Sequence, residues 1–86
     1  MTTIHGQVVD PQGQPVADAS VYIASAPVNM PDVAQLTDDQ GRFVIAAPVP
    51  GSYVVGVRSD LWGLTQVDVD VSEKGPVTVE VRFTRS

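Results

Sequence analysis

Apolar and polar residues alternate one by one in several short stretches of this chain, and this period constrains the fold more than any other feature. Across residues 66–72, valines alternate with Asp68 and Asp70, and across residues 77–83 every second position is again apolar. Successive side chains of a strand point to opposite faces of its sheet, so each stretch has one apolar and one polar face. Apolar spacings of three and four residues are absent. The sequence therefore predicts strands and no helix, in a sandwich with one buried and one wet face per sheet.

The alternation and the turn residues between stretches together predict seven strands. The expected strands cover residues 4–9, 19–24, 34–37, 42–46, 52–59, 66–72 and 77–83. About seven short strands separated by regular turn signals are typical of a β-sandwich. A chain of 86 residues corresponds to one domain, here residues 1–86, and the absence of cysteine excludes a disulfide framework.

The turns at residues 10–13 and 38–41 each have the pattern Asp-x-x-Gly. An aspartate at the first turn position can accept a hydrogen bond from a nearby backbone N–H, and the glycine can adopt a positive φ. Asp10, Gly13, Asp38 and Gly41 are therefore predicted to be structural turn residues. Arg42 is expected to pack or pair beside its turn.

The same aspartates offer a second interpretation, a calcium site. Asp38 and Asp39 could converge with Asp10 or Asp18 on an ion that prefers six to eight oxygen ligands. The segment 38–41 lacks the alternating spacing of an EF-hand loop, and aspartate-rich turns normally bond their own backbone. We therefore expect no metal and no cofactor.

The turn at residues 36–45, the opening segment 6–21 and the motif PGSYVV at residues 50–55 carry a family resemblance. From Ile4 to Phe83 the chain resembles the carboxypeptidase regulatory-like family of transthyretin-like (prealbumin-like) β-sandwiches. The resemblance implies an all-β, seven-stranded antiparallel Greek-key β-sandwich. It also implies a non-catalytic module, of a kind that is commonly part of larger and often exported proteins.

Charge and hydropathy exclude several partners. The net charge of -5 and the pI of about 4.3 give a field that repels nucleic acid and anionic lipid, and the five basic residues are scattered. No apolar run approaches the roughly 18 residues of a membrane span, so we expect no membrane insertion. Residues 1–7 lack the features of a signal peptide, which predicts a cytoplasmic location if Met1 is the native start.

The leading functional hypothesis is a module for protein–protein interaction or scaffolding. A partner protein, or a second copy, could bind through the sheet edges, because edge strands carry unpaired backbone groups. Two segments interrupt the alternation of strands and turns, residues 25–33 and 60–64, and loops on a rigid scaffold commonly bind partners. Asn29, Met30, Leu61 and Trp62 are the candidate partner-binding residues.

Carbohydrate binding is the alternative hypothesis. The single tryptophan, Trp62, could stack on a sugar ring, with help from Tyr22 or Tyr53. Tryptophan is also a large apolar residue that is usually mostly buried, so Trp62 could equally plug one end of the core. The same residue therefore supports a glycan site or a structural role.

A third hypothesis, hydrolysis of hydroxyisourate, comes from the same type of fold. Transthyretin-like hydroxyisourate hydrolases use an early histidine, a central arginine, a late histidine and a Tyr-Arg-Gly-Ser tail. His5 and Arg42 match the first two, but this chain has no second histidine and ends in Thr84-Arg85-Ser86, without the tyrosine and glycine. We therefore assign no catalytic residues and expect no enzymatic activity.

Overall fold

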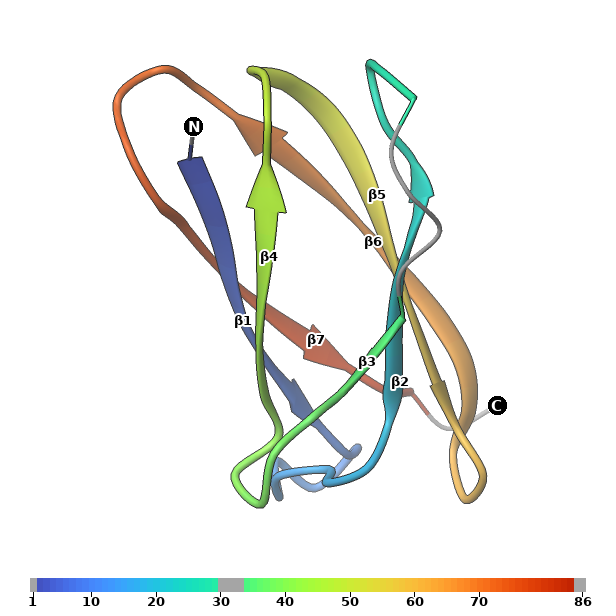
Figure 1. The fold of residues 1–86 in the computed structure, drawn as a ribbon. Coiled ribbons are helices and arrows are strands. Elements are labelled where there is room, and N and C mark those ends of the chain that lie inside the picture. The colour runs from blue at the N-terminus through green and yellow to red at the C-terminus, as the bar shows by residue number, and fades with distance from the viewer. Residues whose placement is uncertain (1, 30–33, 85–86) are drawn as a thin grey trace.

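The computed structural model describes residues 2–29 and 34–84, and these form strands and turns with no helix. The seven strands are β1 (Thr2–Val9), β2 (Ser20–Ser25), β3 (Gln35–Leu36), β4 (Arg42–Ala47), β5 (Gly51–Ser59), β6 (Gly63–Val71) and β7 (Val77–Arg82) (Figure 1). Among the described residues there is accordingly no helix of the length and hydropathy needed to span a bilayer.

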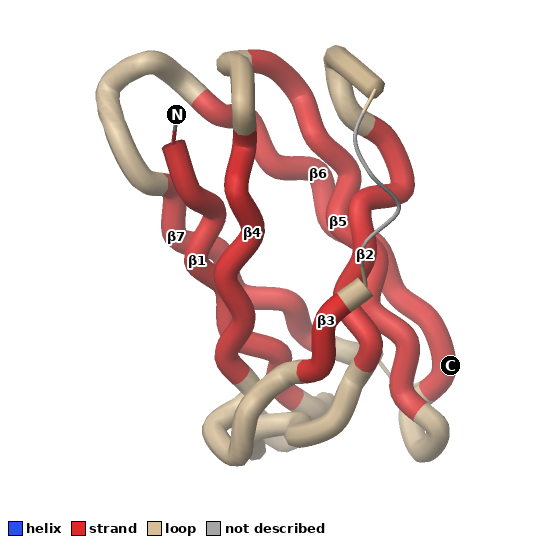
Figure 2. The backbone as a smooth tube through the Cα atoms, viewed as in Figure 1, coloured by secondary structure: helices blue, strands red, loops and turns tan. Residues whose placement is uncertain are grey.

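The strands form two facing sheets, seen as two layers in Figure 2. One sheet has three strands in the order β4-β1-β7, and the other has four in the order β3-β2-β5-β6. The chain changes sheet between β1 and β2, β3 and β4, β4 and β5, and β6 and β7. This arrangement confirms the predicted all-β sandwich with crossing, Greek-key connections.

One strand pair differs from the predicted antiparallel arrangement. β1 and β7 run parallel, in a register from Ile4 opposite Val77 to Val9 opposite Arg82, whereas the other pairs are antiparallel. β1 and β7 are the first and last strands and no hairpin connects them. The alternation of apolar residues is the same for both directions, so it could not reveal this pairing.

The segment 60–64 is shorter as a loop than expected. β6 begins at Gly63, and Gly63 and Leu64 lie opposite Ser59 and Arg58 of β5 in a tight hairpin. The predicted start at residue 66 was wrong because Gly63, with a φ of 89°, and the exposed Leu64 interrupt the apolar alternation without interrupting the ladder.

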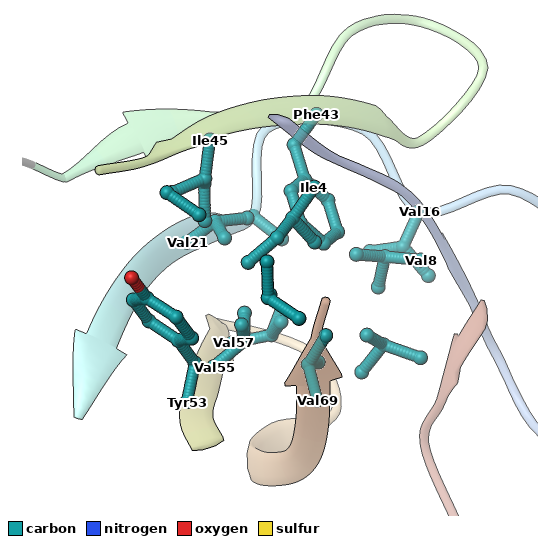
Figure 3. Close-up of a cluster of buried hydrophobic side chains, with 14 of the residues drawn as sticks. Ile4, Val8, Val16, Val21, Phe43, Ile45, Tyr53, Val55, Val57 and Val69 are labelled. Atoms are coloured by element: carbon teal, nitrogen blue, oxygen red, sulfur yellow. The ribbon is translucent and has the colours of Figure 1, made fainter. Parts of the chain in front are cut away.

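The core lies between the two sheets and is almost entirely apolar. In Figure 3, Phe43 and Ile45 of β4 point toward Tyr53, Val55 and Val57 of β5 across the sandwich. Phe43 and Ile45 are buried, as is Val21 of β2. Tyr53 is fully buried, and its hydroxyl donates to the Val49 carbonyl at 2.6 Å.

Two aromatic rings cover glycines in neighbouring strands. Phe43 lies opposite Gly6 and its ring occupies the space that a Cβ at Gly6 would need, on the core side of the three-stranded sheet. Tyr22 lies opposite Gly56 on the outer face of the four-stranded sheet, and its ring occupies the space that a Cβ at Gly56 would need. Glycine inside each of these strands therefore allows an aromatic ring to pack directly against the backbone.

The connection from β1 to β2 is held by the buried Thr37. Its hydroxyl donates to the Val16 carbonyl at 2.7 Å and accepts from the Ala19 N–H at 3.0 Å. Between them Asp18 adopts a positive φ of 59°, which aspartate tolerates better than most residues. Thr37 thus satisfies backbone groups that the crossing chain would otherwise bury unpaired.

Candidate interaction surfaces

The turns at residues 10–13 and 38–41 have the same hydrogen-bond pattern. The Asp10 carboxylate accepts from the N–H groups of Gln12 and Gln14, each at 2.9 Å, and the Gly13 N–H donates to the Asp10 carbonyl at 3.0 Å. A carboxylate that is used in this way closes its own turn. No group of three or more metal-ligating side chains gathers within residues 2–29 and 34–84.

Asp38 closes the second turn in the same manner. Its Oδ1 accepts from the N–H groups of Arg42 and Gln40 at 2.9 Å, and these bonds, the Arg42 one first, hold the pKa of Asp38 below its ordinary value of 3.8. The Arg42 guanidinium adds a smaller attraction. Because the folded pKa is lowered, this stabilisation is present above pH 3.8 and is lost as the pH falls through the lowered pKa.

Arg42 itself is exposed at the start of β4. The preceding residue, Gly41, is hydrogen-bonded to β1 through its backbone. The Gly41 carbonyl accepts from the Val8 N–H at 2.7 Å, and a Cβ at Gly41 would collide with the Val8 carbonyl. Gly13 has open space around it instead, with only the Arg82 side chain at 3.8 Å.

The predicted partner-binding residues lie at opposite ends of the sandwich. Leu61 and Trp62 form the turn between β5 and β6, whereas Asn29 is exposed in the loop after β2. β2 runs from Ser20, opposite Arg58, to Ser25, opposite Val54, so this loop is at the far end of β5 (Figure 1). Met30 lies outside the described residues. The structure does not bring the two groups together.

The aromatic residues have different environments. Trp62 is half-buried and packs against the core, while Leu61 beside it is 79% exposed. Tyr53, considered as a helper in glycan binding, is fully buried and cannot contact a ligand. Tyr22 is half-buried on the outer face of the four-stranded sheet.

A surface around Tyr22 is not predicted by the sequence. On the outer face of that sheet, paired positions of the four strands form one row, which consists of Leu36, Ser20, Arg58 and Leu64. We call this row together with Tyr22 the Tyr22 face. Leu36 and Leu64, at the two ends of the row, are 63% and 62% exposed. Only the pairing of strands brings these residues together, so no local sequence signal could have found them.

A shallow depression of about 540 Å³ lies on the Tyr22 face. Its lining includes Tyr22, Arg58, Asp60 and Leu64. The ring of Tyr22 cannot sink further because it already lies over the backbone of Gly56. The face therefore combines exposed apolar side chains, an aromatic ring and one arginine on four paired strands.

A second depression, of about 500 Å³, lies on the outer face of the three-stranded sheet and brings His5 and Arg42 together with Glu80. The His5 ring is 2.8 Å from the Thr3 hydroxyl, and Arg42 lies opposite Gln7 of β1. Thr78 of β7 lies opposite His5, and the chain has no second histidine.

The fold and these surfaces define a small transthyretin-like β-sandwich domain. The family model of the carboxypeptidase regulatory-like domain matches residues 3–84, and this chain belongs to that family. A search of curated proteins gave no match.

Solved structures with this fold include proteins of different kinds. A variant of BcpA, the major pilin subunit of Bacillus cereus, matches with a TM-score of 0.71 and 14% identity, and BcpA itself with 0.70 and 15%. Each match covers 99% of this chain, which spans only 30% of the pilin. The 5-hydroxyisourate hydrolase of Klebsiella pneumoniae matches with 0.66 and 17% identity, over 99% of this chain and 93% of the enzyme.

Proposed function

We propose that this domain is a non-catalytic module that binds another protein through the Tyr22 face. The membership in a regulatory-like domain family and the similarity to domains of pilin subunits support a binding role over an enzymatic one. The partner we propose is a protein surface that offers apolar side chains to Leu36 and Leu64 and a carboxylate to Arg58.

The observation that carries this proposal is the exposed row that crosses the four-stranded sheet. Leu36 and Leu64 are each more than three-fifths exposed, and Ser20 and Arg58 lie between them in the row. Large apolar side chains that gather on one face of a rigid sheet lose contact with water when a partner covers them, and this burial drives association. Arginine between them can add a charge-assisted hydrogen bond.

A photo-crosslinking amino acid at position 64 tests the proposal in an extract of the source organism. We expect a protein to be cross-linked and identified by mass spectrometry, and its binding to the wild-type domain to be lost in Leu64→Asp and Arg58→Glu. The reason is that both changes place carboxylates where an apolar, acidic surface must dock.

Val44→Asp is the matched control. Val44 is also an exposed apolar residue, 49% exposed, but it lies on β4 in the other sheet. The partner should still bind this variant. Equal loss of binding in Val44→Asp and Leu64→Asp would show that the Tyr22 face is not the binding surface.

We propose no reaction at His5 and Arg42, although they share a depression. The exposed His5 ring is paired with Thr3, β7 presents Thr78 and Glu80 to the same face, and the chain has no second histidine. We expect no turnover of 5-hydroxyisourate above the uncatalysed rate, measured by its absorbance decay. Turnover that disappears in His5→Ala would contradict a non-catalytic role.

A further inference from the structure

The four edge strands of the sandwich are protected to different degrees. β3 has two residues, and the free edge of β4 is covered at Val44, whose N–H and carbonyl bond the Gln35 side-chain amide at 3.2 and 2.6 Å. β6 carries Asp68 and Asp70 and no basic residue, so a second β6 would meet like charges. Charged side chains of one sign and short strands are devices that keep edges from pairing.

β7 has none of these protections within the part of the chain that the structure describes. It pairs with β1 on one side and is the last strand of its sheet on the other. The Phe83 N–H donates to the Val9 carbonyl at 3.0 Å, so the odd-numbered residues direct their backbone groups to β1. The N–H and carbonyl groups of Thr78, Glu80 and Arg82 therefore point to the free edge, because these groups alternate along a strand.

The residues of β7 and its extension are self-complementary. When two antiparallel copies are centred on Val81, Glu80 of one chain lies opposite Arg82 of the other, and Thr78 lies opposite Thr84. These are the positions whose backbone groups point outward, so the register makes hydrogen-bonded pairs. A shift of two residues in either direction would place Glu80 opposite Glu80 or Arg82 opposite Arg82, which is repulsive.

Burial along the same strand agrees with a missing neighbour. Val77 and Val79 point toward the core but are only half-buried, whereas Val81 is buried. In the register centred on Val81, Val79 lies opposite the partner subunit's Phe83 on the inner face. A second copy would therefore extend the apolar layer over the part of Val79 that water now contacts.

We propose that two copies of this domain pair antiparallel through β7, with Val81 on the two-fold axis, so that their three-stranded sheets join into one continuous sheet. This inference rests on the proposed protein-binding function and names a second copy of the chain as one partner. The Tyr22 face lies on the other sheet and stays free for a different protein. The interface is isologous, as a two-fold dimer requires.

Charge exchange between the paired positions tests the dimer. Sedimentation analysis of the full chain over a wide concentration range should show a monomer–dimer equilibrium. Glu80→Arg and Arg82→Glu should each weaken dimerisation, by about tenfold or more, because two attractive cross-strand pairs become repulsive. A mixture of the two variants should recover wild-type affinity as a heterodimer, since every arginine then faces a glutamate.

Each variant also loses the Glu80–Arg82 pair within its own chain, a surface contact of 4.0 Å. This loss is the same in the mixture, so recovery there can come only from contacts between chains. A protein that stays monomeric at all concentrations, or a dimer that neither variant weakens, would overturn the proposal. Loss of partner binding through the Tyr22 face would leave both results unchanged, so the two proposals fail separately.

Single cysteines test the register, because the chain has none of its own. Val81→Cys should form a disulfide-linked dimer on mild oxidation, since the Cα atoms of a non-hydrogen-bonded pair are about 4.5 Å apart, within the range that a disulfide can bridge. Val79→Cys should remain unlinked, because the two cysteines would be four residues out of register, about 13 Å. Equal linkage of both variants would contradict the register.

Discussion

Gly13 and Gly41 occupy the same position in two turns of the same pattern, with φ angles of 85° and 74°. Their surroundings differ. The Cβ of an alanine at 13 would enter open space, whereas at 41 it would meet the Val8 carbonyl and, at 3.0 Å, the Val16 N–H. Positive φ is thus the requirement at the first turn, and positive φ together with close backbone approach is the requirement at the second.

Gly13→Ala and Gly41→Ala form a matched pair. We expect Gly13→Ala to lower the free energy of unfolding by about 1–2 kcal/mol, the cost of a left-handed alanine. Gly41→Ala should lower it by roughly 3 kcal/mol or more, because overpacking adds to that cost. Urea unfolding at pH 7, followed by tryptophan fluorescence, measures both. Equal losses would show that the close contact with the Val8 carbonyl does not affect the free energy of unfolding.

At this scale the sequence predicts what is local. The roles of Asp10 and Asp38 follow from turn rules that involve residues at most four apart, and the structure shows those bonds. The buried hydroxyls of Thr37 and Tyr53 were not predicted. Thr37 bonds residues 18 and 21 positions away, and whether Tyr53 faces the core or finishes an outer face depends on the other sheet.

At the scale of the elements, the Gln35 side chain makes the hydrogen bonds to β4 that a neighbouring strand would make. Its side-chain amide accepts from the Val44 N–H and donates to the Val44 carbonyl, as a neighbouring peptide group would. β3 itself ends after Leu36 and pairs only with β2. One side chain therefore covers an edge that the backbone leaves open.

Gln35→Leu should expose the β4 edge. We expect a loss of about 1 kcal/mol in the free energy of unfolding, from two hydrogen bonds that water partly replaces. Aggregation on incubation at high concentration should increase, measured by light scattering, because an uncovered edge can recruit another strand.

Gln14→Leu is the control for the added apolar surface. Gln14 is exposed between β1 and β2, and its side chain makes no hydrogen bond with the described part of the chain. This variant should aggregate less than Gln35→Leu. If both aggregate equally, the amide of Gln35 has no protective role.

The existence of the elements was predictable, and their pairing was not. Alternation located seven strands because one face of each strand is buried, and this burial gives each strand its own pattern of apolar residues. The parallel contact of β1 with β7 and the two-residue length of β3 depend on which strands meet in space. The Tyr22 face also depends on strand pairing, since Leu36 and Leu64 lie in one row only because β2 and β5 pair between β3 and β6.

At the scale of the whole molecule, the two sheets leave the sandwich with different surfaces at its ends and edges. The β5–β6 turn closes one end, where Trp62 packs against the core and Leu61 faces water. The loop that contains Asn29 is at the other end (Figure 1). A partner that contacts both groups of residues would have to reach along the length of β5.

The position of Trp62 decides between a structural plug and a platform for sugar rings, and the chain contains no other tryptophan. A sugar stacks on an open ring face, whereas this ring is half-buried against core side chains. We expect its emission maximum to shift to longer wavelength on unfolding in urea and to stay unchanged when soluble glycans are added to the folded protein. A saturable change in emission with one glycan, absent with the others, would instead place carbohydrate binding at the β5–β6 end.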